Sequence, residues 1–230
     1  MTAEVALIVG AGSGLSASLA RLFTAEQMHV ALAARNVDKL TGLCEQTGAL
    51  AIACDATEPP AVDALFDTVA RKLGEPNVVV YNAGRRLRGP IQTLDPSEVH
   101  RAWLARCFGG FLVGQQAARR MLALGRGTIL FTGATASVKA FAESAAFAMG
   151  KFALRGLAQS LARELSPQGI HVAHFVIDGG IAQPGREPPS REPDALLDPD
   201  AIAQTYLGVL RQPRSAWSWE VEVRPWVERF

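Results

Sequence analysis

A glycine loop near the start of the chain has the pattern of a phosphate-binding turn. Residues 9–16, VGAGSGLS, follow an apolar run and open a segment with helical spacing. Gly10 suits a tight turn, and Gly14 lets a ligand approach the backbone closely. The following helix would present N–H groups and the positive end of its dipole to a phosphate. The loop therefore predicts a dinucleotide site, although Ser16 stands where G-x-x-x-G-x-G has its last glycine; the alternative is a purely structural turn.

The end of the second apolar run bears on which dinucleotide this site takes. A site for NAD usually places an acidic side chain here, where it binds the ribose 2′-hydroxyl. This chain has Ala34 followed by Arg35. A guanidinium offers a forked, permanently charged set of donors, which suits the 2′-phosphate of NADP. We therefore expect NADP rather than NAD; the alternative is a solvated arginine at a strand end.

Short apolar runs alternate with longer segments of helical spacing along the chain. Several runs are apolar almost throughout, as parallel strands covered on both faces are. Asp95 and Asp198 each precede a proline, the pattern of an N-cap followed by the first helical residue. This alternation predicts an α/β fold with a doubly wound parallel sheet. The expected strands lie at 4–9, 28–34, 49–54, 77–81, 127–132 and 170–177, with a last edge strand indicated by Trp219, Val221 and Val223.

One long irregular segment interrupts the alternation. Residues 179–199 are rich in proline and charge, and they follow the sixth expected strand. A loop of that length in a compact domain is usually functional or disordered. Ligands bind at the carboxyl ends of the strands in such sheets, so we expect this segment to be a mobile lid over the site.

Composition narrows the class of protein. The chain has 230 residues, 49% hydrophobic and 20% charged, which fits one globular domain over 1–230. A net charge of +1 provides no field for nucleic acid or a membrane surface. Cys44, Cys54 and Cys107 lack the spacing of a metal site or disulfide framework, so we expect no metal and a reducing compartment. The first apolar run begins at Val5, which leaves no room for a signal peptide before it, and no apolar run approaches the ~20 residues that span a bilayer. We therefore expect a cytoplasmic protein.

Several motifs together resemble the short-chain dehydrogenase/reductase family. They are the glycine loop, residues 54–57 after the third strand, 81–84 after the fourth, and 151–181. The resemblance implies a Rossmann-type sheet of seven parallel strands, NAD(P)-dependent carbonyl and alcohol chemistry, and a homodimer or homotetramer packed through the helical segments 96–124 and 143–166. It also implies that the cofactor is bound by Gly10, Ser13, Gly14, Leu15, Arg35, Asp55, Ala56, Asn82, Ala83, Gly84, Lys151 and Ile181.

The same resemblance implies a catalytic set in which three of four positions are replaced. Members use a tyrosine as proton donor, a serine that positions the substrate oxygen, and an asparagine that holds a relay water. Phe147, Ala134 and Arg106 fall at those positions here. The fourth member is a lysine that lowers the tyrosine pKa and binds the nicotinamide ribose, and it is present as Lys151. Hydroxyl groups that could replace the serine after a small shift are on Thr132, Thr135 and Ser137.

Lys151 is the one member of this catalytic set that the sequence retains. It can bind ribose hydroxyls without a tyrosine, so its retention indicates a nucleotide site in use; the alternative is a lysine left on a helix face. The apolar Phe147 and Ala134 beside it favour the neutral amine. General acid catalysis contributes roughly 10²–10⁴-fold, so we expect weak reduction of ordinary ketones.

Arginines gather in the segments expected near the site. Arg106 joins Arg85, Arg86 and Arg88 after the fourth strand and Arg186 and Arg191 in the long loop. This pattern predicts a cleft for a carboxylate or phosphate ligand; the alternative is a set of solvated charges, with Arg106 paired to Glu98 or Glu143. The functional hypotheses are an NADP(H)-dependent oxidoreductase with an altered proton relay, a catalytically inactive NADP(H)-binding sensor or partner subunit, and a structural oligomer subunit.

Overall fold

All the strands of the described residues form one parallel sheet, with the order β3-β2-β1-β4-β5-β6-β7. The computed structural model describes residues 3–84, 87–183, 185–190 and 192–227. The predicted seven-stranded Rossmann-type fold is confirmed, and the crossover between β3 and β4 reverses the strand order beside β1. The strands are β1 (Val5–Val9), β2 (His29–Ala34), β3 (Leu50–Ala53), β4 (Val78–Tyr81), β5 (Gly127–Thr132), β6 (Ile170–Ile177) and β7 (Glu220–Val223).

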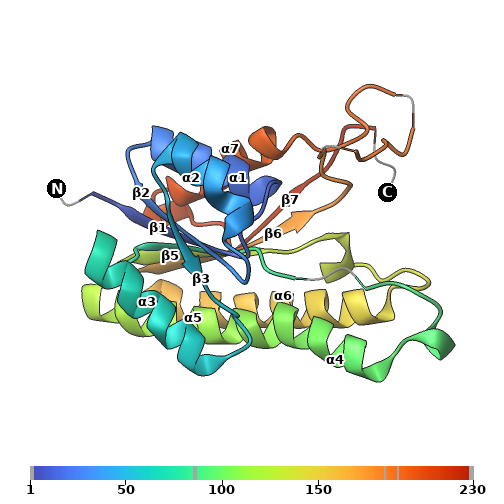
Figure 1. Ribbon diagram of the computed structural model, residues 1–230, viewed down its shortest axis with the longest axis horizontal. Helices are drawn as coiled ribbons and strands as arrows, with labels where there is room; N and C mark the ends of the chain where they lie inside the picture. Colours follow the sequence, from blue (N-terminus) through green and yellow to red (C-terminus); the bar gives the residue numbers. More distant parts are fainter. Residues whose placement is uncertain (1–2, 85–86, 184, 191, 228–230) are drawn as a thin grey trace.

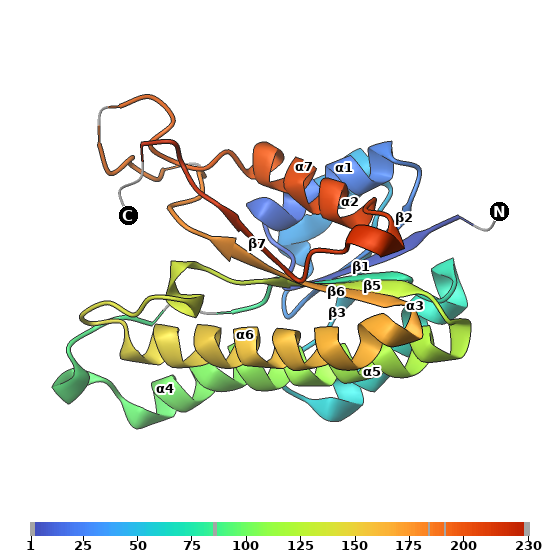
Figure 2. The ribbon, with the colours of Figure 1, turned by 180° about the vertical axis from the view of Figure 1, so that it is seen from behind.

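Helices cover both faces of the sheet (Figures 1 and 2). Helices α3, α4, α5 and α6 lie on one side, and α1, α2 and α7 lie on the other. Because side chains alternate along a strand, Val5, Leu7 and Val9 face the first layer while Ala6 and Ile8 face the second. The helices are α1 (Leu15–Ala25), α2 (Thr41–Thr47), α3 (Pro59–Leu73), α4 (Pro96–Trp103), α5 (Gly109–Leu124), α6 (Ala145–Leu165) and α7 (Pro199–Leu210).

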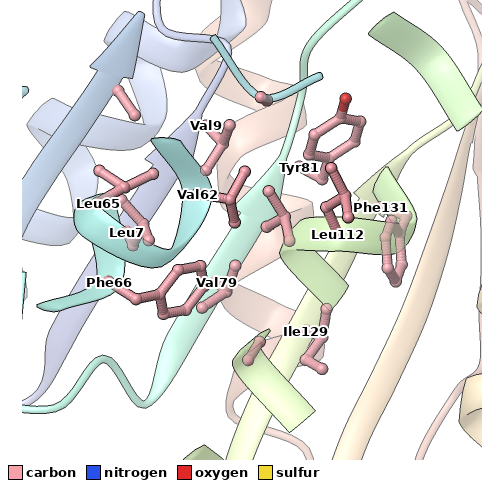
Figure 3. Close-up of a cluster of buried hydrophobic side chains, with 14 of the residues drawn as sticks. Leu7, Val9, Val62, Leu65, Phe66, Val79, Tyr81, Leu112, Ile129 and Phe131 are labelled. Carbon is pink, nitrogen blue, oxygen red and sulfur yellow. The ribbon is translucent and has the colours of Figure 1, made fainter. Parts of the chain in front are cut away.

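The core between the sheet and α3 and α5 holds large apolar side chains in contact. Figure 3 shows Phe66 of α3 and Leu112 of α5 beside Val79, Ile129 and other strand residues. Strands β1, β4 and β6 are buried along their whole length, which explains why their sequences are almost entirely apolar. The rigid sheet fixes the positions of the loops at its carboxyl edge.

The predicted helix starts are confirmed in atomic detail. The Asp95 carboxylate accepts the Ser97 amide at 2.7 Å, and that of Asp198 accepts the Asp200 amide at 2.9 Å. The segment 96–124 differs from one continuous α-helix, because Leu104–Phe108 form a π-helical turn between α4 and α5. Such turns often occur at functional sites. This one contains Arg106.

The long segment 179–199 is tied at its base. Ile181 and Leu197 form an isolated parallel bridge, with the Ala182 amide donating to the Leu197 carbonyl and the Leu197 amide to the Gly180 carbonyl, both at 2.8 Å. The described parts between these anchors extend away from the sheet (Figure 1). Its role as a mobile lid stays a prediction.

The last strand lies beside β6. The predicted edge strand is confirmed as β7, in which Val221 pairs with Phe175. Trp226, which follows this strand, is 74% exposed in the single chain; Phe230 lies outside the described residues. No helix in the described part of the chain is long and apolar enough to cross a membrane.

Candidate functional site

The glycine loop has the geometry that a phosphate-binding turn needs. Gly10 has a φ of +89°, and a Cβ there would lie 2.4 Å from the Ala83 nitrogen, so only glycine fits. The Ser16 hydroxyl donates to the Gly10 carbonyl at 3.2 Å and accepts from the Asn82 amide at 2.8 Å. These bonds join the turns after β1 and β4. A Cβ on Gly14, at the start of α1, would meet no atom within 4 Å, so the loop faces open space.

The predicted Arg35 and Asp55 lie at the ends of β2 and β3, on one side of this loop. Burial opposes ionisation of Asp55, but hydrogen bonds from the Thr57 hydroxyl and amide, at 2.8 and 3.0 Å, together with the charge of Arg35, hold its pKa below the ordinary value. Arg35 is exposed, whereas Ala56 is buried. This corner therefore offers one accessible cation and one ionised carboxylate.

A cavity of about 420 Å³ lies on the other side of the loop, at the carboxyl ends of β4, β5 and β6. It brings together residues predicted from three distant parts of the sequence. The predicted residues Gly10, Ser13, Arg35, Asp55 and Ala56 lie outside its wall. Those that line it are Gly14, Leu15, Asn82, Ala83, Gly84, Arg106, Ala134, Phe147, Lys151 and Ile181.

Lys151 lies on α6 one turn after Phe147, at the buried wall of the cavity. Its Nζ donates to the Thr132 carbonyl at 2.6 Å, and the side chain is only 8% exposed. Burial, assisted by the charge of Arg106, lowers the pKa of Lys151 to about 7. The predicted shift towards the neutral amine is therefore confirmed in direction.

Arg106 is not a solvated surface charge. It is 1% exposed, and its guanidinium carbon lies 4.4 Å from the centre of the Phe147 ring, a cation–π contact. Two glycines make room for it, since a Cβ on Gly84 or Gly150 would come within 3.0 Å or 2.9 Å of its side chain. Of the acids proposed to pair with it, Glu98 forms an ion pair with Arg101.

The hydroxyl groups near Ala134 are mostly engaged elsewhere. Thr132 Oγ1 lies 2.8 Å from the Tyr206 hydroxyl, and Ser137 Oγ accepts the Ala134 amide at 3.1 Å. Thr135 lines the cavity. The chain has two tyrosines, and burial raises the pKa of both; Tyr81 donates to the Ala105 carbonyl at 2.6 Å. Neither tyrosine belongs to the cavity wall formed by the described residues.

The described part of the cavity wall is rich in basic side chains. Arg88, Arg106 and Arg186 line it beside the Lys151 amine, and none of the described lining residues is an aspartate or glutamate. The predicted Arg85, Arg86 and Arg191 lie outside the described residues. Nor do the described residues contain a group of three metal-ligating side chains. A small anion is the ligand that this electrostatic arrangement favours.

A polar network behind the cavity, which includes the buried His174, was missed from the sequence. His174 Nδ1 lies 3.0 Å from Glu220 Oε2, and Glu220 forms two bonds with Arg155, at 2.6 and 2.7 Å. Burial lowers the pKa of His174 to about 4. A Cβ on Gly133 would lie 2.3 Å from His174 Nε2, so the histidine packs directly behind the cavity wall. The sequence feature that could have indicated this network is a histidine within a largely apolar strand.

The fold and the glycine loop define a Rossmann-type α/β protein with a dinucleotide-binding turn at the switch point of its sheet. Residues 4–186 match the model of the short chain dehydrogenase family. The chain belongs to that family.

Relatives support this assignment over most of the chain. Short chain aldehyde dehydrogenase 1 of Euphorbia lathyris is 29% identical over 213 residues, covering 90% of this chain and 73% of its own length. The crystal structure of a short-chain dehydrogenase from Rhodopseudomonas palustris is 36% identical with a TM-score of 0.83, covering 97% of this chain and 99% of its own. A metagenomic short-chain oxidoreductase in complex with NADP is 28% identical with a TM-score of 0.84, covering 96% and 97%.

Proposed function

We propose that this protein is an NADP(H)-dependent oxidoreductase with an altered proton relay, acting on a small anionic substrate. The observation that carries the proposal is the position of Lys151 in an arginine-lined cavity beside the glycine loop. The similar short-chain oxidoreductase solved with NADP supports the choice of cofactor. We propose that residues 1–230 act as one domain and that 179–199 close over the site.

The residues at the site fit an NADP(H) molecule. Gly14 and the amino end of α1 would hold the diphosphate, Arg35 the 2′-phosphate, and Lys151 the nicotinamide ribose. Asp55 and Asn82, at the carboxyl edge of the sheet, would also contact the cofactor. The cofactor supplies a hydride or takes one up, and the chain supplies binding, orientation and exclusion of water.

The altered relay rests on Phe147, Ala134 and Arg106, which stand at the family's tyrosine, serine and asparagine positions. The contact of the Arg106 guanidinium with the Phe147 ring ties two of these replacements to each other. It places a permanent cation where a proton donor and a relay water would otherwise act. Orientation of donor and acceptor can still supply up to about 7–11 kcal/mol of rate enhancement, so turnover of a suited substrate remains feasible.

An anionic substrate follows from the charges. Arg88, after β4, and Arg186, after β6, line the cavity, and Arg106 forms part of its buried wall. A carboxylate between them would form charge-assisted hydrogen bonds, which are about twice as strong as neutral ones. A simple neutral ketone offers these cations no charge to bind.

The second candidate is a catalytically inactive NADP(H)-binding sensor or partner subunit. The burial of Tyr81 and Tyr206 away from the cavity favours it, because neither can act as the proton donor. The experiment that separates the candidates combines an NADPH binding titration with an NADPH oxidation assay on neutral ketones and oxo acids. Turnover of an oxo acid supports the oxidoreductase; tight binding without turnover on the whole panel supports the sensor; failure to bind NADPH contradicts both.

We propose a homodimer or homotetramer packed through α5 and α6. Large apolar side chains on these helices are exposed in the single chain, and packing against a second copy would remove them from water. Cys44, Cys54 and Cys107 are free thiols, which is consistent with a cytoplasmic location. The exposed apolar residues on α5 and α6 are Phe111, Leu122, Leu124, Met149 and Phe152.

A further inference from the structure

Lys151 differs from every other lysine of this chain in its surroundings. Lys39, Lys72 and Lys139 are exposed, whereas Lys151 is 8% exposed and lines the cavity. Its amine is held by the Thr132 carbonyl, which orients it without supplying a negative charge. Lys151 is therefore a primary amine at the wall of a cavity large enough for a small molecule.

The groups around Lys151 disfavour the ammonium form. The cation of Arg106 comes from the turn before α5, and Phe147 supplies an apolar ring one helical turn away. On β6, His174 is held neutral by burial, and the carboxylate of Glu220 on β7 is occupied by Arg155 and His174. A desolvated lysine next to another cation is a recognised form of activated amine nucleophile.

The same cavity carries the means to hold a carboxylate. Arg88 and Arg186 line it with Arg106, and no acid is found among its described lining residues. A small oxo acid could place its carboxylate among these guanidinium groups and its carbonyl carbon against the amine. A neutral ketone would have only the second of these interactions.

We propose that the Lys151 amine condenses with the carbonyl group of a small 2-oxo acid to form a reversible imine in the cavity lined by Arg88, Arg106 and Arg186. The neutral Nζ adds to the carbonyl carbon, and one of its two protons passes to the carbonyl oxygen. The resulting hydroxyl group then leaves as water with the second proton of the amine, which gives a C=N bond. No oxidant or reductant is consumed. This activity goes beyond the proposed NADP(H) chemistry and does not depend on it.

Reductive trapping on the full chain tests the proposal. The protein is incubated with pyruvate and sodium cyanoborohydride without nicotinamide cofactor, and then analysed by intact mass and peptide mapping. The expected product is heavier by the mass of the oxo acid minus one oxygen atom, with the label on Lys151. At pH 7 an amine with a pKa of about 7 has roughly 10³-fold more neutral form than an exposed lysine, so labelling of Lys151 should exceed that of Lys139 at least about tenfold.

Matched variants locate the effect. Lys151→Arg replaces the amine by a guanidinium, which cannot form the imine, and should abolish the label, whereas Lys139→Arg, at an exposed position, should leave it unchanged. Arg186→Gln should reduce trapping of pyruvate more than trapping of acetone, and Arg126→Gln, at the opposite end of the sheet, should affect neither. Label spread evenly over exposed lysines of the wild-type chain would overturn the proposal without any variant having to fold.

The outcome is separable from that of the proposed function. Trapping on Lys151 in a protein that does not bind NADPH would support the imine site and contradict the proposed oxidoreductase. NADPH binding with no label on Lys151 would contradict the imine site and leave the proposed oxidoreductase supported.

Discussion

Phe147→Tyr combined with Ala134→Ser is expected to raise the reduction of ordinary ketones about 10²-fold or more. The double change supplies the proton donor and the hydroxyl that positions the substrate oxygen, next to a lysine that is already in place. Phe147 is only partly buried and lines the cavity, so a hydroxyl on its ring points at space rather than into packed core.

The structure indicates that the new tyrosine would have a low pKa. The Arg106 guanidinium lies 4.4 Å from the ring centre, which puts it about 5 Å from a hydroxyl at the ring edge. At an effective dielectric constant of about 20, a cation at that distance stabilises the phenolate by about 3 kcal/mol, or roughly 2 pKa units. The tyrosine pKa would then fall from about 10 towards about 8, where a general acid is effective near neutral pH.

The assay is the rate of NADPH oxidation with a panel of ketones, measured as kcat/KM across pH. The double variant should gain a basic limb near the tyrosine pKa that wild type lacks. A gain of 10² corresponds to about 2.7 kcal/mol of transition-state stabilisation. Phe152→Tyr is the matched control, because this exposed phenylalanine on the same helix should change neither rate nor pH profile.

Two results would refute this reasoning in different ways. If wild type already reduces a panel ketone at the family's usual efficiency, the assignment of Phe147 to the tyrosine position is wrong. If the double variant binds NADPH yet stays inert on every ketone, the cavity serves another purpose and the sensor hypothesis gains. Arg106→Asn would follow as a third change, at a cost in stability because a buried side chain is truncated.

Three other measurements check separate parts of the interpretation. Arg35→Ala should weaken NADPH binding about tenfold while leaving NADH binding unchanged, and equal affinity of wild type for both cofactors would contradict the NADP preference; Arg126→Ala is the charge-matched control. Burial lowers the pKa of Lys151 to about 7 in the folded state, below its unfolded value, so the unfolded state binds more protons between pH 7 and 10. Over that range the free energy of unfolding of wild type, measured in urea, should rise by up to about 1.4 kcal/mol per pH unit relative to Lys151→Met. A difference between the two proteins that does not change with pH would contradict the buried amine. Amide hydrogen exchange should be fast at 185–190 without ligand and slower with NADP, while the Leu197 amide is protected in both states. Strong protection of 185–190 in the ligand-free protein would contradict the prediction of a mobile lid.

The sequence was sufficient for the features that depend on local pattern. Continuous apolar runs identified the buried strands, and Asp95 and Asp198 marked two helix starts, because burial on both faces and N-capping leave their pattern within a few residues. The glycine loop was identifiable for the same reason: the turn needs a positive φ at Gly10, which the residue type itself indicates.

The tertiary structure decided how distant residues combine, because those contacts leave no local pattern. From the sequence Arg106 could equally have been a solvated charge, and only the approach of Gly84 and Gly150 and its contact with the Phe147 ring bury it in the cavity wall. Glu220 reaches His174 from a strand far along the chain, so neither residue alone predicted the network behind the cavity. Hydrophobicity alone does not decide burial either: Trp226 is exposed, because the described chain brings no neighbour close enough to cover it.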